Sequence, residues 1–372
     1  MWRNKWKKVK SGWQKDPDDD KNNDKNEIKN EQIIQTVARK NIFERFFKWI
    51  IYFILFISIP RYLKSSKSKG KEIVNNAYAK LNSNEFAFIP VGYAMYLFLS
   101  FIPISIILVS IIAPIRPEYD VIFRYAILGR IIPGIESVLP KSITEIWTSA
   151  GGATTFVLLA LSIIFFTSKG YAKFIVSIDV LYEHQTTFRM WKGRIKGVFV
   201  SIFLILALTL ILLGFTAFMT FLVEKANFGD FSNVQSVASV YDLKLTWHFW
   251  FIYYLLIVIM LPPFTYLGFA LFYLYAPNFK LKFSHVHPGA LITAIPTSLF
   301  ILIFGSLTSI FNYQKFGPVA AFMYLILLLT FMAYFTYAGV IVNSSFYKTF
   351  VNIITIDKRS FFKGGKNTIN ID

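Results

Sequence analysis

The sequence lacks cysteine altogether and contains only four histidines among its 372 residues. Without cysteine the chain can form no disulfide, no thiolate metal site and no cysteine nucleophile. A metal-dependent nuclease needs several carboxylates or imidazoles converging on a cation. The one close histidine pair, His285 and His287, precedes Pro288 without a cluster of acidic residues nearby, and we interpret both as loop or interfacial histidines.

Recognisable catalytic motifs are also missing. The sequence has no Walker phosphate loop, no Gly-x-Ser-x-Gly and no His-Glu-x-x-His. These absences disfavour a hydrolase, a ribonuclease and an ATP-driven pump. We therefore expect that the protein is not an enzyme and that it holds no metal and no cofactor.

Apolar and aromatic side chains, by contrast, are abundant. Apolar residues make up 55% of the sequence, aromatic residues 18% and charged residues only 16%, as is typical of a polytopic membrane protein. A helix needs about 20 apolar residues to cross a bilayer. Such runs occur at residues 88–113, 147–168, 198–223, 247–275, 288–311 and 318–346. The sequence therefore predicts an all-α polytopic membrane fold with six transmembrane helices.

Basic residues outside these runs predict the orientation of the helices. The formal net charge is +18, and residues 169–196 contain six basic and two acidic side chains, whereas residues 116–145 contain four of each. By the positive-inside rule both termini are cytoplasmic, and the wealth of Lys, Asn, Ile and Phe is typical of a bacterial plasma-membrane protein from an AT-rich genome. We expect the basic residues to contact anionic lipid headgroups and not nucleic acid. The oligomeric state stays open.

A shorter apolar run, Trp49 to Pro60, precedes the six long ones. As a helix it is about 18 Å long, short for a hydrocarbon core of about 30 Å. We interpret residues 42–63 as an amphipathic interfacial helix on the inner leaflet, with a short extra span as the alternative. Residues 1–41 are predicted to be a disordered charged cytoplasmic tail, 72–346 the membrane domain and 347–372 a basic cytoplasmic tail.

The most informative stretch is residues 161–197, where an apolar run passes without a turn signal into a charged amphipathic segment. Only Gly170 interrupts the helical pattern over residues 147–184, and on a helical projection the four ionisable residues at 169, 173, 179 and 183 form one ionic face. The candidates for a substrate pathway are Ser168, Lys169, Lys173, Asp179 and Glu183. Lysines that snorkel to the interface are the alternative. The residues that either bind headgroups or only set the topology are Arg189, Lys192, Arg194 and Lys196.

Helix-breaking and small polar residues punctuate the apolar runs. Proline removes a backbone hydrogen bond and should kink a helix, whereas small residues permit close helix packing. The residues that we expect to kink or pack the helices are Ser100, Pro103, Pro262, Pro263, Pro288, Gly289, Gly339 and Asn343. A substrate path and simple packing are both consistent with them.

Four blocks, in order, resemble the YihY/BrkB family of bacterial inner-membrane proteins, formerly labelled ribonuclease BN-like, over about residues 72–346. They are VGYAMYLFLSFIPISIIL at 91–108, the segment from Thr167 to Gly197 with its Ser-x-Gly and later Tyr and Arg residues, HPGALITA at 287–294 and AGVIVNSSF at 338–346. The third contains a Pro-Gly-Ala, and the fourth is similar to the family's closing Gly-Ala-Glu-x-Asn through Gly339 and Asn343.

The resemblance implies a six-helix membrane fold and points to transport or lipid export. Two departures stand out: Asp179 lies where the family usually has Asn, and Ile341 where it usually has Glu, so any ion coupling or binding by that Glu is absent here. We predict a transporter or lipid translocase for an anionic or amphipathic substrate. The alternative is a non-catalytic scaffold that binds anionic lipids or partner proteins, and a ribonuclease is the least favoured reading.

Overall fold

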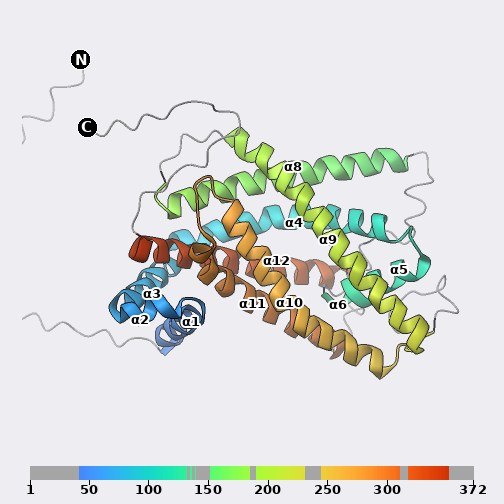
Figure 1. Cartoon of the computed structure of the whole chain (residues 1–372). Coiled ribbons are helices and arrows are strands. Elements are labelled where there is room, and N and C mark those ends of the chain that lie inside the picture. Colours follow the sequence, from blue (N-terminus) through green and yellow to red (C-terminus); the bar gives the residue numbers. More distant parts are fainter. Residues whose placement is uncertain are drawn as a thin grey trace, which may run out of the picture. The chain divides into compact units, whose positions relative to one another are not determined.

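In the computed structural model of the chain, every long regular element among the described residues is a helix (Figure 1). The structure describes residues 42–131, 135, 139, 151–184, 190–230, 244–310 and 317–351. The chain divides into two units, Met1–Phe46 and Phe47–Asp372. Of the first unit only the start of α1 (Ile42–Ser58) is described, so the account below concerns the second.

Six helices in the described ranges are long and apolar enough to cross a membrane. They are α4 (Asn84–Ile112), α8 (Gly152–Leu181), α9 (Met190–Ala226), α10 (Trp247–Tyr275), α11 (Phe283–Ile310) and α12 (Gly317–Phe346). Each contains or largely overlaps one of the predicted apolar runs. The prediction of an all-α fold with six membrane-length helices is therefore confirmed.

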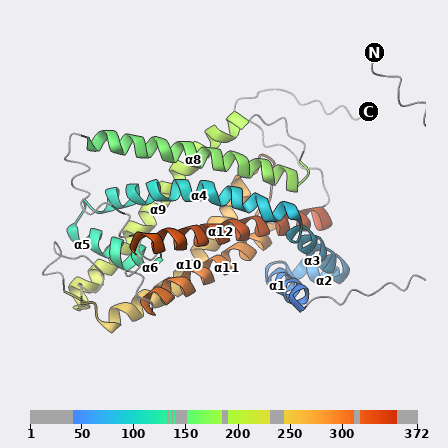
Figure 2. The ribbon, with the colours of Figure 1, turned by 180° about the vertical axis from the view of Figure 1, so that it is seen from behind.

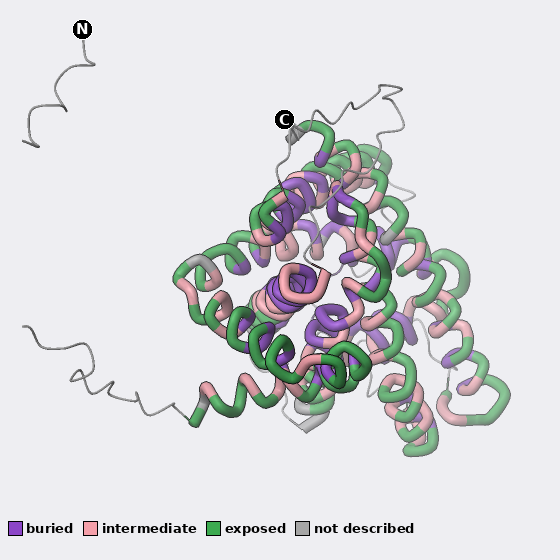
Figure 3. The backbone as a smooth tube through the Cα atoms, turned by 60° about the vertical axis from the view of Figure 1, so that its left-hand side comes forward, coloured by how far each residue is buried: buried purple, intermediate pink, exposed green. Residues whose placement is uncertain are grey.

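α12 lies in the interior of this arrangement. It packs along α11 and against α4, and α4 packs against α8 (Figure 2). In the most apolar window of each helix, 56% of the α12 residues are buried but only 6% of those of α9 and of α10. The burial colours of Figure 3 show the same contrast between inner and outer turns. Nearly all apolar side chains in these windows of the outer helices are therefore exposed or half-buried, as lipid contact requires.

The connection between α4 and α8 contains a buried helical segment that was not predicted from the sequence. It consists of α5 (Pro117–Val121), the π-helix η3 (Ile122–Leu128) and α6 (Gly129–Ile131). Most η3 side chains lie in the largest apolar core. A Cβ added at Gly305 of α11 would lie only 2.6 Å from the Arg130 carbonyl oxygen, so glycine there lets α6 approach α11 closely.

The helices before α4 are α1, α2 (Pro60–Ser65) and α3 (Lys67–Leu81). From Phe47 on, α1 has apolar side chains on two faces. Ile54 and Leu55 are buried in a core shared with α3 and α12, whereas Trp49 and Phe53 are 59% and 49% exposed. The predicted interfacial helix thus exists as a helix with two apolar faces, and its place in a membrane stays a prediction.

The prolines predicted to kink helices lie inside helices that continue through them. α4 runs through Pro103, α10 through Pro262 and Pro263, and α11 through Pro288. Ser100 is buried, and its hydroxyl donates to the Tyr96 carbonyl oxygen at 2.5 Å. The helices therefore absorb these residues without ending, and the predicted kinks stay a prediction.

Candidate functional site

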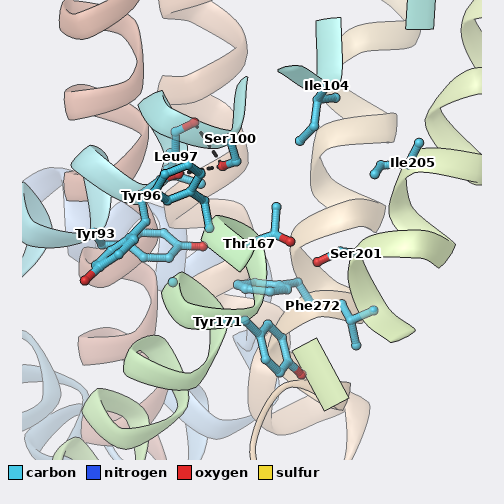
Figure 4. A pocket seen from close by; sticks show the side chains of 13 residues that line it. Tyr93, Tyr96, Leu97, Ser100, Ile104, Thr167, Tyr171, Ser201, Ile205 and Phe272 are labelled. Atoms are coloured by element: carbon cyan, nitrogen blue, oxygen red, sulfur yellow. Dashed lines mark hydrogen bonds between the residues drawn. The ribbon is translucent and has the colours of Figure 1, made fainter. Parts of the chain in front are cut away.

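A cavity of about 170 Å³ lies among α4, α8 and α9, with Phe272 of α10 also in its wall (Figure 4). Two close helix contacts determine its position. A Cβ added at Gly197 of α9 would lie 3.0 Å from the Ser168 Cα atom of α8, and one at Gly170 would lie 2.9 Å from the Tyr96 Cβ atom of α4. α9 crosses α8 near its own start and then runs away from it (Figure 1). The cavity occupies the space beside this crossing.

Aromatic and aliphatic side chains form most of the cavity wall, together with three small hydroxyl residues. The hydroxyls of Ser100, Thr167 and Ser201 donate to backbone carbonyl oxygens of their own helices at 2.5, 2.6 and 2.6 Å. The buried Tyr171 hydroxyl has no hydrogen-bond partner among the described residues. The wall therefore offers few donors to a polar solute.

Two of the predicted pathway residues lie at the rim of this cavity. The ammonium groups of Lys169 and Lys173 lie 5.9 and 4.9 Å from the ring centroid of Tyr96, which lines the cavity. Lys169 also lies 5.6 Å from the Phe165 ring centroid. Aromatic faces attract cations at such distances. The α8 lysines therefore place positive charge at one edge of an otherwise apolar cavity.

The other two ionisable residues of the predicted ionic face turn elsewhere. Asp179 is only 4% exposed, and the Asn278 side-chain amide donates to its carboxylate at 3.4 Å. Glu183 lies beyond the end of α8 with a left-handed φ of 55°, and its carboxylate accepts a hydrogen bond from Lys348. That bond lowers the pKa of the Glu183 carboxyl below its ordinary value. The prediction of one continuous ionic face is therefore wrong.

The end of α8 explains this correction. The amide of His184 donates to the Asp179 carbonyl at 2.8 Å and that of Glu183 to the Val180 carbonyl at 3.1 Å. These two bonds and the left-handed Glu183 form a Schellman motif, which closes a helix. Because glycine usually occupies the left-handed position, its absence hid the helix end from the sequence analysis. Ser168 instead packs against Gly197 at the helix crossing.

The basic residues after α8 have separate roles. Arg189 lies outside the described residues. Lys192 is exposed, and the Arg194 guanidinium lies 5.7 Å from the Trp191 ring centroid. Lys196 donates to three carbonyl oxygens at the end of α10, those of Tyr275, Ala276 and Pro277, at 2.8, 2.9 and 3.3 Å. Lys196 thus caps α10, a role that sequence reasoning missed because its partners are distant in the chain.

Replacing Lys196 with methionine should destabilise the protein. Ala276 and Pro277 are buried, so their carbonyls cannot simply rebind water once the ammonium is lost. We expect a loss of about 1.5–3 kcal/mol, the range for hydrogen bonds to charged groups, seen as a lower Tm in detergent. Lys192→Met removes an exposed cation from the same helix and should leave the Tm unchanged; equal Tm values for the two variants would contradict the capping role.

Gly289, Gly339 and Asn343 meet where α11 packs against α12, and the buried Pro288 precedes Gly289 in α11. The Gly289 amide donates to the side-chain oxygen of the buried Asn343 at 2.6 Å. A Cβ added at Gly339 would lie 2.6 Å from the Gly289 carbonyl oxygen. The two glycines therefore bring the backbones of the helices together, and Asn343 satisfies an amide at the contact.

Hydroxyl groups extend this contact to α10. Thr293 donates to the carbonyl of Gly289 at 3.0 Å and to that of Phe335 at 2.9 Å. The Tyr273 hydroxyl donates to the Thr336 carbonyl at 2.7 Å and lies 2.6 Å from the Thr293 hydroxyl. These bonds join three helices through buried polar atoms. This junction has a structural role, which agrees with the packing interpretation of its residues.

The same residues carry two of the sequence blocks that resemble a known family, and a comparison with family models tests that resemblance. A family model described as "Virulence factor BrkB" matches residues 77–359, well over half of the chain. The chain belongs to the BrkB family. A search of curated proteins found no match, and a search of solved structures found none either. The BrkB match spans all six long helices, so the resemblance is confirmed and the chain is a multi-pass membrane protein.

Three of the four histidines of this BrkB-family chain, His248, His285 and His287, lie in helices. His285 and His287 fall in the first turns of α11, and His287 forms a hydrogen bond with the Tyr266 hydroxyl at 2.5 Å. The interpretation as loop histidines is therefore wrong, and the interfacial alternative stays a prediction. Within the described ranges no three His, Asp or Glu side chains are grouped to hold a metal ion.

Proposed function

We propose that this BrkB-family protein is a non-enzymatic transporter or lipid translocase for an anionic or amphipathic substrate. The cavity among α4, α8 and α9, with Lys169 and Lys173 at its rim, is the observation that carries the proposal. Ionisable residues inside membrane helices are costly and usually mark a substrate path. Both lysines lie within the membrane-length part of α8.

The lysine pair itself favours an anionic substrate. Lys169 and Lys173 are one helical turn apart, an arrangement in which like charges repel by about 0.2–0.5 kcal/mol. The Tyr96 ring offsets part of this repulsion for both. A carboxylate or phosphate group at the rim would offset the remaining repulsion between the two lysines and would gain charge-assisted hydrogen bonds.

Transport by variants of α8 tests the proposal. In proteoliposomes that contain a fluorescent anionic phospholipid, Lys169→Ala and Lys173→Ala should each lower the translocation rate by about tenfold or more, the equivalent of one lost charge-assisted interaction. Both variants should still insert in the membrane. Lys192→Ala, which removes an exposed cation outside the cavity, is the matched control. Wild-type rates in both Lys169→Ala and Lys173→Ala would refute the pathway.

The scaffold alternative has its own observation. The α2 and α3 helices expose a row of basic side chains, and α1 exposes aromatic ones beside them. The exposed basic residues are Arg61, Lys64, Lys67, Lys69 and Lys71. Such a surface suits anionic headgroups of one leaflet. A scaffold would keep lipid binding here and show no translocation.

The proposed location is a bacterial plasma membrane with both termini in the cytoplasm, as the basic loops predict. Because the chain contains no cysteine, a single cysteine can report its orientation. In intact cells, Asn75→Cys on the exposed face of α3 should resist a membrane-impermeant maleimide and react after the cells are opened. Labelling of this cysteine in intact cells would show that the protein has the opposite orientation in the membrane.

A further inference from the structure

We infer that the cavity among α4, α8 and α9 is a binding site for one hydrocarbon chain of an anionic amphiphile, which enters sideways from the bilayer and leaves its headgroup at Lys169 and Lys173. This inference rests on the proposed function for its physiological use, because it names the substrate class of the same site. We call the cavity the chain site below.

The size of the chain site limits what it can hold. Its volume is about 170 Å³, whereas sites that enclose a drug-sized solute span about 300–1,000 Å³. An apolar cavity of about 150 Å³ is enough to bind benzene. The chain site therefore accommodates a segment of hydrocarbon and is too small to enclose a complete drug-sized solute.

The chemistry of the wall agrees with an apolar guest. Leu97, Ile104, Ile205 and Phe272 supply apolar surface, and Ile104 and Ile205 lie toward one end of the site in Figure 4. The hydroxyls of Ser100, Thr167 and Ser201 already donate to backbone carbonyls. A sugar or amino acid that entered would lose its water and gain few hydrogen-bond donors in return, the Tyr171 hydroxyl among them.

The depth of the chain site determines what lies outside it. Thr167 falls near the midpoint of α8 (Gly152–Leu181), and Ser100 falls near the midpoint of the span Phe86–Ile112. At that depth the surroundings of a membrane protein are acyl chains and not water. Phe165, Ile202 and Phe203, on either side of the α8 and α9 crossing, are exposed. A guest therefore reaches the site from the bilayer.

The lysines match a headgroup attached to such a chain. Lys169 and Lys173 lie two and six residues beyond Thr167, about 3 and 9 Å along the helix axis. Both therefore lie between the middle of α8 and its C-terminal end at Leu181. A lipid whose acyl chain fills the site thus has its anionic headgroup within reach of two ammonium groups. The apolar cavity and the two lysines match the apolar and the negative end of such an amphiphile.

Photolabelling of the full chain in phosphatidylcholine nanodiscs tests this inference. The probe is a trace of phosphatidylglycerol with a diazirine in one acyl chain, and mass spectrometry locates the adducts. Wild-type protein should carry adducts on the residues that line the site. Ile205→Trp and, independently, Ser201→Phe fill the site and should reduce these adducts by at least about tenfold, the effect of excluding about two buried methylene groups. Leu210→Trp, on the exposed face of α9, should leave them unchanged.

The headgroup is tested in the same experiment. Lys169→Gln and Lys173→Gln should each lower the preference for labelled phosphatidylglycerol over labelled phosphatidylcholine by about five-fold, as expected for loss of one basic residue near a headgroup. Unlabelled phosphatidylglycerol should compete, and inorganic phosphate should not. Competition by phosphate, or equal labelling of the two lipids in wild-type protein, would overturn the inference that the site prefers an anionic amphiphile.

The outcomes separate this inference from the proposed function. One contrary result is that the adducts persist in both filled variants, and another is that they spread evenly over the exposed faces of α8 and α9. Either result would mean that the probe labels the protein from the surrounding lipid, and it would overturn the chain site even if translocation proceeds. Site-specific adducts without translocation would overturn the transporter and leave the site intact. Gel filtration of each variant confirms that it is folded, and the two filling variants are independent of each other.

Discussion

Replacing Gly289 with alanine is expected to remove nearly all folded protein from the membrane. The added Cβ would overlap the carbonyl oxygen of Gly339 and the side-chain amide of Asn343. Backbone atoms cannot rotate away as a side chain can, so α11 and α12 must separate and the bond from the Gly289 amide to Asn343 is lost. We expect a destabilisation of more than about 3 kcal/mol, beyond ordinary overpacking. Gel filtration yield and Tm measure it.

Glycines elsewhere in the membrane helices provide matched controls. A Cβ added at Gly214 of α9 or at Gly268 of α10 meets nothing within 4 Å. Alanine there should leave the Tm unchanged or raise stability by up to about 1 kcal/mol, because alanine favours helix more than glycine does. Gly339→Ala should behave like Gly289→Ala, since its Cβ would lie 2.6 Å from the Tyr273 hydroxyl oxygen. A Gly289→Ala protein as stable as Gly214→Ala would refute the close contact between α11 and α12 at Gly289.

Replacing Asp120 with asparagine is expected to destabilise the buried segment between α4 and α8. The guanidinium of Arg124, only 2% exposed, donates to the Asp120 carboxylate at 3.0 Å and 3.2 Å. The change keeps the shape of the side chain but leaves the Arg124 charge without this carboxylate. Losing one partner of a buried ion pair costs about 3–5 kcal/mol. Because the Asp120 side chain is 26% exposed, we expect about 3 kcal/mol, measured by thermal unfolding.

A neighbouring ion pair is the control for this change. Glu118 pairs with Arg116 at 3.3 Å, and the Arg116 side chain is 45% exposed. Glu118→Gln should therefore cost at most about 1 kcal/mol. Hydrogen exchange should also show faster exchange of residues 117–131 in Asp120→Asn than in Glu118→Gln. Similar Tm values for the two variants would show that the buried pair contributes little.

Features that depend on contacts between distant residues were not predictable from the sequence. The η3 segment is a short apolar stretch in a connection, too short to register as a membrane helix, and only its packing reveals that it is core. Lys196 caps the end of α10, about 80 residues away. No local pattern indicates such a partner. The same holds for the chain site, which results from the angle at which α9 leaves α8.

The ionic face of α8 illustrates the limit of a local pattern. Its charges align on an ideal helix, but the left-handed Glu183 ends the helix and Asp179 turns to Asn278. Lys169 and Lys173 remain at the rim of the chain site because the Tyr96 ring holds both ammonium groups. Helical projection predicted two of the four positions, because it describes direction around one axis and contains no neighbouring helix.

The amino-acid sequence alone was enough to predict the six membrane-length helices and the family, because crossing the hydrocarbon core requires about 20 consecutive apolar residues and each run meets that requirement without its neighbours. It also supplied the small residues Gly289 and Gly339 that later proved to be contact points. The packing of the helices was needed to learn which helices meet there, which partners Lys196 and Arg124 have, and that an apolar cavity lies beside two lysines. Hydropathy is a property of single residues, whereas cavities, caps and buried ion pairs exist only once separate segments pack together.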